Sequence, residues 1–266
     1  MNTFGYYDPT SVLKAVGIME DKPEARFLAG GQTLLATMRL RLAAPSDLVD
    51  LSHIPELKGI RVEASGAAIA IGAMTRHSEV AASPEVAARI RALAELAGLI
   101  GDRQVRNRGT LGGSIANNDP AADYPAAILG LGATVTTNKR TIGADAFFTD
   151  MFETALAPGE LITSVSFPVP KRAAYVKFRN AASRFAIVGV FAALTSQGAR
   201  VAVTGARSRG VFRVAQMEEA LNREWSPAAL RSITVPPDDL QTDLHASAQY
   251  RAHLIHVLAQ RAVAAA

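Results

Sequence analysis

The chain has 266 residues, 49% hydrophobic and 20% charged, which is the balance of a globular protein with a real core. Its formal net charge of +4 comes without any run of five Lys or Arg residues, so we expect no nucleic-acid binding, and the absence of cysteine excludes a disulfide, a thiolate nucleophile and a Cys-ligated iron–sulfur or zinc site on this chain. The longest apolar run, residues 185–194, is about half of what a membrane helix needs, and residues 1–11 lack the regions of a signal peptide, so we expect a cytoplasmic protein without membrane contact.

The first elements are separated by clear turn signals. Asp8-Pro9 is typical of a helix start, with Asp at the N-cap and Pro in the first turn, and this helix is predicted to end near Met19. Residues 25–42 predict a strand, a Gly-Gly turn and a second helix that begins near Thr33. Residues 47–52 predict a short strand.

A hairpin and a further helix are expected next. Residues 61–75 alternate around Ser65-Gly66, which predicts a hairpin with three side chains directed inward: Val62, Ile69 and Ile71. Ser83-Pro84 predicts a helix that runs to about Leu96, by the same capping argument as at Asp8.

Strands dominate the prediction from residue 125 onward. Residues 125–133 predict a helix or compact apolar turn, and strands are expected at 134–137 and 160–170. Pro168 and Pro170 mark a boundary, because two prolines so close cannot lie in a central strand.

The segment beyond residue 170 is rich in Val, Ala and Phe. Three strands are expected within residues 174–206, then two helices at Ala215–Asn222 and Ser247–Ala264. The last helix is predicted to present one face formed by Tyr250, Leu254, Val257, Leu258 and Arg261. We therefore predict an α+β chain of two domains, 1–170 and 171–266.

Two glycine loops share one pattern, an apolar approach, Gly-Gly and then a polar residue. They are residues 29–33 and 111–114. A Gly pair lets successive backbone N–H groups point the same way and lets a ligand approach where a Cβ would block it. Two such loops could close on one pyrophosphate from both sides, although two unrelated turns are the alternative on residue types alone.

The familiar nucleotide motifs do not fit either loop. Neither ends in the Lys-Ser/Thr of a P-loop, and neither matches G-x-G-x-x-G after a strand with an acidic residue about 20 positions on. The loops therefore predict neither a nucleoside triphosphatase nor a Rossmann dinucleotide site.

Ordered matches extend the loop pattern over nearly the whole chain. They are residues 28–52, 71–80, 106–126, 160–168, 175–178 and 243–254. In order and content these segments resemble the flavin-binding medium subunit of the molybdenum hydroxylases, the family of the carbon monoxide dehydrogenase flavoprotein and of the FAD domain of xanthine dehydrogenase. One Gly-Gly pair is a weak signal, but the ordered set is specific.

The resemblance implies both a fold and a set of FAD contacts. The implied fold is a vanillyl-alcohol-oxidase-like (PCMH-type) FAD-binding domain of two subdomains, about 1–57 and 58–170, with a C-terminal α/β domain at 171–266 that closes over the flavin. Two groups of residues would line the pyrophosphate, mainly through backbone N–H groups: Leu28, Ala29, Gly30, Gly31, Gln32, Thr33, Leu34 and Leu35, with Thr110, Leu111, Gly112, Gly113 and Ser114.

Single residues complete the implied cofactor site. Asp123 would bind the adenosine ribose or nearby polar groups, and Lys177 would lie near the flavin or a phosphate. Further positions included in the site are Ile100 and Ile162, for apolar packing, with Asn117 and Phe185.

Two departures from the family pattern stand out. Gln32-Thr33 replaces His-Ser or Gln-Ser, and both side chains can still donate hydrogen bonds. Arg184 stands where many relatives have Asp, which changes the polar environment expected beside the flavin.

The remaining polar clusters have plainer interpretations. The five histidines are scattered, and His253 and His256 are expected to lie on a solvated or packed helix face rather than to bind a metal. Arg103, Arg106 and Arg108 are expected to form a solvated positive edge, with phosphate or partner contact as the alternative. Asp119 and Asp123 are expected in a turn rather than in a paired-carboxylate site.

By resemblance, the chain is an electron-transfer subunit. It would take electrons from iron–sulfur clusters on a small subunit and pass them through FAD to an external acceptor. The complete enzyme would also contain a large subunit with the molybdenum cofactor, and the heterotrimer of the three subunits would pair with a second copy. The absence of cysteine agrees, because clusters must then lie on another chain. The alternatives are a stand-alone flavin oxidoreductase and a non-redox nucleotide-binding or assembly protein.

Overall fold

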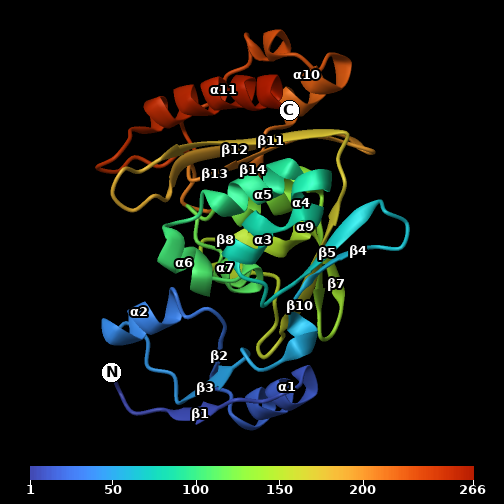
Figure 1. Ribbon diagram of the computed structural model, residues 1–266. Helices are drawn as coiled ribbons and strands as arrows, with labels where there is room; N and C mark the ends of the chain where they lie inside the picture. Colours follow the sequence, from blue (N-terminus) through green and yellow to red (C-terminus); the bar gives the residue numbers. More distant parts are fainter.

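A small parallel sheet organises the start of the chain, which the computed structural model describes from residue 1 to residue 266 (Figure 1). Its strand order is β1-β3-β2, with all pairs parallel. The elements of this segment are β1 (Gly5–Tyr7), α1 (Val12–Asp21), β2 (Arg26–Leu28), α2 (Leu34–Arg39), β3 (Asp47–Asp50) and the 3-10 helix η1 (Pro55–Leu57). A core of its own forms between α1 and the sheet, with Ala15, Val49, Leu51 and Ile54 among its members.

The predicted start of the first helix was wrong. Ser11, with an extended backbone, is the N-cap of α1, and its hydroxyl accepts a hydrogen bond from the Lys14 N–H at 3.4 Å. Asp8 and Pro9 lie in the turn that leaves β1, so they precede the helix. The predicted second helix is confirmed, since Thr33 is the N-cap of α2.

An antiparallel sheet with several short helices forms the middle of the chain. Its order is β4-β5-β10-β6-β7. The strands are β4 (Ile60–Val62), β5 (Ala68–Gly72), β6 (Thr134–Thr137), β7 (Thr141–Gly143) and β10 (Ile162–Pro168), with a separate two-stranded ribbon β8 (Phe148–Asp150) and β9 (Glu153–Thr154). The helices are α3 (His77–Ala82), α4 (Pro84–Arg89), α5 (Arg91–Gly98), α6 (Arg103–Arg108), α7 (Leu111–Asn117), α8 (Tyr124–Leu131) and α9 (Ala144–Phe147).

The hairpin of β4 and β5 is confirmed, with Ile69 and Ile71 fully buried and Val62 half-buried. The single helix expected from Ser83 to Leu96 is instead two helices. Ser83 caps α4 as predicted, but Ile90 leaves the helical conformation at φ −138° and α5 starts after it. Ile90 is buried, so the break places this side chain in the core at the cost of helix continuity.

A four-stranded antiparallel sheet and two outer helices complete the fold. The sheet order is β11-β12-β13-β14. The elements are β11 (Arg172–Arg179), β12 (Ala186–Thr195), β13 (Gly198–Thr204), β14 (Phe212–Arg213), α10 (Ala215–Arg223), the 3-10 helix η2 (Pro227–Leu230) and α11 (Ala248–Ala265). Figure 1 shows α10 and α11 on one face of this sheet and the helices of the middle segment on the other.

Coverage of both faces explains why β12 is apolar along nearly its whole length. Phe191 and Ala193 belong to the core shared with α8, whereas Val190 and Ala192 belong to the core under α11. Successive side chains of β12 are therefore buried alternately in the two cores, one on each face of the sheet. The predicted α+β class is confirmed.

The predicted face of the last helix was partly wrong. Leu254 and Leu258 are buried, but Tyr250 is 43% exposed and Arg261 is exposed. The buried face lies along Arg251, Leu254, Ile255, Leu258, Ala259, Ala262 and Val263. Arg251 lies on it because its guanidinium donates to the carbonyls of Ile187 and Gly205 and to Asp243.

No helix of the structure combines the length and the apolar composition that crossing a membrane requires. The boundary predicted near residue 170 falls in the turn between β10 and β11, and the division into domains stays a prediction.

Candidate functional site

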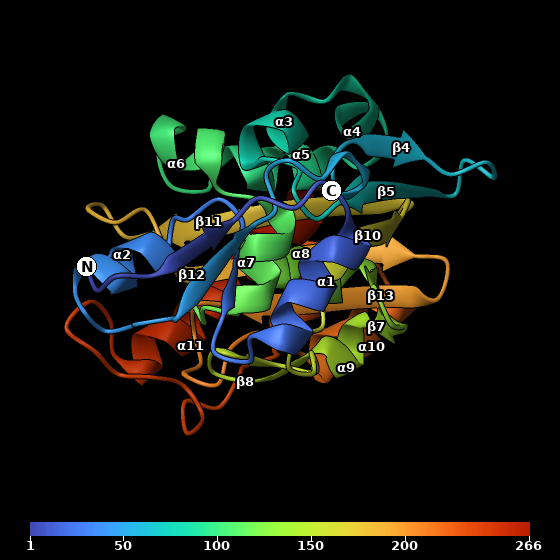
Figure 2. The ribbon, with the colours of Figure 1, turned by 90° about the horizontal axis from the view of Figure 1, so that it is seen from below.

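A cavity of about 710 Å³ lies between the first segment of the chain and α7. In the view from below, the first segment lies across α7 (Figure 2). Fifteen of the predicted cofactor-binding residues line the cavity: Ala29, Gly30, Gly31, Gln32, Thr33, Leu34, Ile100, Thr110, Gly112, Gly113, Ser114, Asn117, Asp123, Ile162 and Phe185. The volume is within the range of small-molecule and cofactor sites.

The two glycine loops touch each other. A Cβ on Gly30 would lie 2.2 Å from the carbonyl oxygen of Arg108, and one on Gly113 would lie 3.3 Å from the Cβ of Ala29. Gly31 has φ +73°, a conformation that side-chain-bearing residues rarely adopt. The glycines are therefore needed for the two loops to meet, and the cavity opens where they meet.

The first loop presents free backbone donors. The N–H groups of Gly30, Gly31, Gln32 and Thr33 donate no hydrogen bond within the protein. They precede α2, whose first turn adds a favourable field for negative charge. This loop is thus available to bind an anionic group through its main chain.

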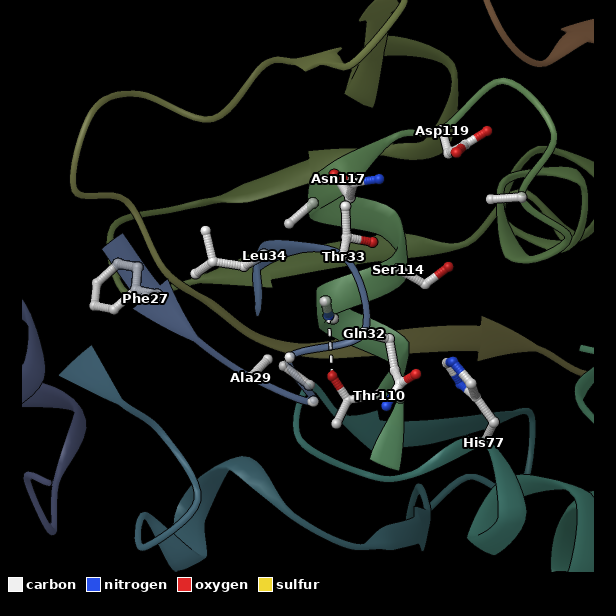
Figure 3. Close-up of a pocket in the computed structure, with 18 of the residues that line it drawn as sticks. Phe27, Ala29, Gln32, Thr33, Leu34, His77, Thr110, Ser114, Asn117 and Asp119 are labelled. Atoms are coloured by element: carbon white, nitrogen blue, oxygen red, sulfur yellow. Dashed lines mark hydrogen bonds between the residues drawn. The ribbon is translucent and has the colours of Figure 1, made fainter. Parts of the chain in front are cut away.

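The second loop differs from the expectation of free N–H groups. Leu111 N–H donates to the Thr75 carbonyl at 3.0 Å, and Gly112 N–H donates to the Ala73 carbonyl at 2.8 Å. Gly113 N–H donates to the Thr110 hydroxyl at 3.2 Å, which caps α7 (Figure 3). The protein itself uses these donors, so the second loop supplies shape and side chains rather than main-chain N–H groups.

Polar side chains without protein partners converge on the cavity. Gln32, Thr33, Ser114 and Asn117 all line it, and none of their side chains makes a hydrogen bond within the protein. Figure 3 shows Gln32 and Thr33 on the first loop and Ser114 and Asn117 along α7. Together with the free N–H groups they form a set of hydrogen-bonding groups available to a ligand.

Asp123 and Lys177 bind each other. The Asp123 carboxylate accepts a hydrogen bond from Lys177 Nζ at 2.9 Å and one from the Tyr175 hydroxyl at 2.5 Å, and Lys177 also donates to the Leu99 carbonyl. Their side chains are 4% and 2% exposed. Burial raises the pKa of Asp123, whereas Lys177 and Tyr175 act to lower it. The pair joins β11, which carries Lys177, to the start of α8, which Asp123 precedes. Asp123 lines the cavity and Lys177 does not.

Three other predicted residues also do not line the cavity. Leu111 is fully buried in the main core, and Leu28 and Leu35 are half-buried beside the first loop. A Cβ on Gly31 would meet Leu35 at 2.8 Å and Leu28 at 3.5 Å, so these leucines pack behind the loop.

Asp119 takes the turn role expected of it, since its carboxylate accepts a hydrogen bond from the Ala121 N–H at 2.8 Å. Asp123 is the N-cap of α8, but its side chain makes no capping hydrogen bond because it is bound by Tyr175 and Lys177.

The three arginines expected to form a solvated positive edge differ in exposure. Arg103 and Arg108 are exposed as expected, whereas Arg106 donates to the carbonyls of Ile100 and Gly101.

The residues between β11 and β12 contribute to the cavity lining. Ser183, Arg184 and Phe185 all line it, and Phe185 is 47% exposed. Arg184 has φ +63°, in the left-handed region. The Asn180 side chain accepts hydrogen bonds from the N–H groups of Ala182 and Ser183, which fixes the turn that presents them.

Two titratable residues of the cavity were not predicted from the sequence as site residues. Burial, with Arg106 nearby, lowers the pKa of His77 to about 4. Hydrogen bonds from Arg140, Ala157 and Thr137 lower the pKa of Glu160 to about 2. The other lining residues that were not predicted include Arg26, Phe27, Met74, Phe152, Leu156 and Leu161. His77 lies in residues 71–80, one of the segments that resemble the flavoprotein family, so the resemblance could have identified it although its residue type alone could not.

Comparison with known proteins gives a consistent match. Residues 2–170 match the family model described as the FAD binding domain in molybdopterin dehydrogenase. The chain is 34% identical to the carbon monoxide dehydrogenase medium chain of Hydrogenophaga pseudoflava, over 99% of this chain and 96% of that one. It is 33% identical to the nicotine 6-hydroxylase medium subunit of Paenarthrobacter nicotinovorans, over 97% and 95%.

Solved structures agree with these relatives. The reconstituted carbon monoxide dehydrogenase from Oligotropha carboxidovorans superposes with a TM-score of 0.90 at 32% identity, covering 100% of this chain and 98% of that one. The quinoline 2-oxidoreductase from Pseudomonas putida 86 superposes with a TM-score of 0.88 at 29% identity, covering 99% and 96%.

Proposed function

Because this chain belongs to the family of FAD-binding domains in molybdopterin dehydrogenases and is an oxidoreductase subunit of it, we propose that it transfers electrons within a molybdenum-containing hydroxylase or dehydrogenase. Electrons arrive from iron–sulfur clusters on a partner subunit and leave to an external acceptor. FAD, when bound, supplies a group that can store two electrons and exchange them one at a time.

The observation that carries this proposal is the set of free hydrogen-bond donors where the two glycine loops meet. Four consecutive main-chain N–H groups, Gly30 to Thr33, have no protein partner and lie at the cavity. A pyrophosphate is an anion with several acceptor oxygens, so it fits such a row of donors. The Ser114 and Asn117 side chains extend the same surface along α7.

The polar groups of the cavity favour electron transfer over substrate chemistry in this chain. Glu160 is bound by Arg140 at 3.0 Å, and Asp123 is bound by Lys177 and Tyr175. Asp119 is held in its turn by Ala121. Each carboxylate that lines the cavity is therefore already hydrogen-bonded within the protein, so none is free to act as a general base on a substrate.

The partners follow from the same proposal. A chain without cysteine cannot hold iron–sulfur clusters through its own thiolates, so the clusters are assigned to a small subunit and the molybdenum cofactor to a large one. The assembly proposed is a heterotrimer that pairs with a second copy. Asp123 and Lys177 would then fix the wall beside the cofactor, rather than bind it through free side chains.

Two measurements test the proposal. The chain purified alone should show the visible absorption bands of oxidised flavin, and the released cofactor should be identified as FAD. A colourless protein that also fails to take up added FAD would contradict it. For the assembly, a tagged chain purified from its native host should bring down two further subunits with molybdenum and iron. Recovery of a flavin-loaded chain without either metal would instead favour a stand-alone flavoenzyme.

A further inference from the structure

We propose that His77 is a further cofactor-binding residue, whose imidazole donates a hydrogen bond to the pyrophosphate of bound FAD beside the two glycine loops. The inference rests on the proposed FAD site and assigns one more contact within it. His77 belongs to neither glycine loop.

The fold fixes the position of this imidazole next to the second loop. His77 is the first residue of α3, and its backbone N–H donates to the Gly109 carbonyl at 3.0 Å. A Cβ placed on Gly109 would lie 2.5 Å from Nε2 of His77. The ring therefore occupies the space that a side chain at position 109 would take, immediately before Thr110 and the cap of α7.

The ring faces the cavity, and one of its nitrogens has no partner. His77 lines the cavity, and Figure 3 shows the ring directed toward the space beside Gln32 and Ser114. The residue is only 4% exposed, and its Nδ1 makes no hydrogen bond. Buried polar groups are nearly always paired in a complete protein. Nδ1 is fully enclosed, so the nitrogen that a ligand in the cavity can reach is Nε2, which also makes no hydrogen bond within the protein.

The charge state suits a donor role. Burial and the nearby Arg106 lower the pKa of His77 to about 4, so the imidazole is neutral near pH 7. A neutral imidazole carries one N–H donor and one acceptor nitrogen. It can therefore donate to a phosphate oxygen without needing a counter-ion of its own.

Packing alone accounts for the ring but not for its nitrogens. The His77 ring lies against Tyr124, with the centroids 5.3 Å apart and the planes tilted by 52°. A phenyl or leucine side chain could fill the same volume without burying an unpaired polar atom. The Tyr124 hydroxyl is also buried and unpaired, but Tyr124 does not line the cavity, which makes it a matched control.

The test measures FAD affinity of the full chain after cofactor removal, by quenching of flavin fluorescence on rebinding. His77→Leu should bind FAD at least about tenfold more weakly, the effect of one lost hydrogen bond to a charged group. His77→Asn and His77→Gln place an amide near Nδ1 and Nε2 respectively, and at least one should recover part of the affinity. Tyr124→Phe should bind like the wild type. Thermal unfolding of each apoprotein identifies any variant that does not fold.

Nuclear magnetic resonance gives a second readout, and its first measurement needs only the wild type. In protein labelled with ¹⁵N-histidine, the imidazole signal of His77 should shift when FAD is added, and the ³¹P signals of bound FAD should differ between the wild type and His77→Gln.

Three results would overturn the inference. One is wild-type affinity in folded His77→Leu, and another is equal loss in the Leu, Asn and Gln variants, which would show a need for ring shape instead of a hydrogen bond. The third is a His77 signal unchanged by FAD. If the wild type itself binds no FAD, the proposed function fails first, and this measurement precedes all the others.

Discussion

Removal of either charge from the Asp123–Lys177 pair should destabilise the protein strongly. The two side chains are 4% and 2% exposed and their charged atoms are 2.9 Å apart, so each single change leaves one buried group without its partner. Breaking a buried pair from one side costs about 3–5 kcal/mol. Lys177→Met should lie near the lower end, because Tyr175 still donates to Asp123. Asp123→Asn should lie near the upper end, because the buried Lys177 ammonium then loses its carboxylate partner and keeps the neutral Leu99 carbonyl as an acceptor.

The double variant separates the pair from the effects of each residue alone. Asp123→Asn with Lys177→Met removes both charges, so the total cost should be smaller than the sum of the single costs, by about 2 kcal/mol. An exposed pair on α5, Arg91 and Glu95, provides the control, and Arg91→Met should cost about 0.5 kcal/mol or less.

Urea unfolding measures these free energies. The single tryptophan, Trp225, packs against the core under α11 and reports on the C-terminal half, while far-ultraviolet circular dichroism reports on the whole chain. Because Asp123 precedes α8 and Lys177 lies on β11, both signals should shift together. Single costs below about 1 kcal/mol, or costs that simply add in the double variant, would refute the assignment of this pair as a buried link between the two halves.

Three further predictions concern the loop, the pH dependence and the core. Gly113→Val should reduce FAD affinity at least about a hundredfold in an absorbance titration, because its Cβ would lie 2.9 Å from the Thr110 hydroxyl and 3.3 Å from the Cβ of Ala29, so the two loops would have to move apart. Gly17→Val, in open space on α1, should leave affinity unchanged, and full occupancy in Gly113→Val would count against the two-loop site. The pKa of Glu160 is lowered from 4.5 to about 2, so its stabilisation is complete above pH 4.5 and is lost as pH falls toward 2. The melting temperature of the wild type should therefore fall more steeply over that window than that of Glu160→Gln, which should cost about 2 kcal/mol at pH 7, and parallel curves would contradict this. Leu258→Ala, at a site 2% exposed under the sheet, should cost about 2–5 kcal/mol in urea unfolding, whereas His253→Ala on the exposed face of α11 should cost less than about 0.5 kcal/mol.

The sequence by itself determined the features that depend on neighbours along the chain. Ser83-Pro84 predicted the start of α4, Ser65-Gly66 predicted the hairpin, and the Gly-Gly pairs predicted two loops. Local signals of this kind act through a residue's own backbone preferences and through hydrogen bonds across three or four positions. The ordered matches along the chain then predicted the family, which the comparisons confirm.

Local signals also failed where tertiary packing competed with them. Ile90 interrupts the helix expected from Ser83 because its side chain is buried in the core, and the buried face of α11 includes Arg251 because distant carbonyls bind it. The start of α1 lies at Ser11 because Asp8 and Pro9 belong to the turn that leaves β1. In each case a contact with another element outweighs a preference of about 1 kcal/mol.

Only the tertiary structure decided which groups of the site are free to bind a ligand. The sequence treats the two glycine loops alike, yet the second loop's N–H groups are used by Thr75, Ala73 and Thr110, while those of the first loop have no partner. Asp123 and Lys177 are 54 positions apart and bind each other, and His77 enters the cavity from α3. A donor's availability depends on every acceptor within about 3 Å in space, and most of those acceptors are distant along the chain.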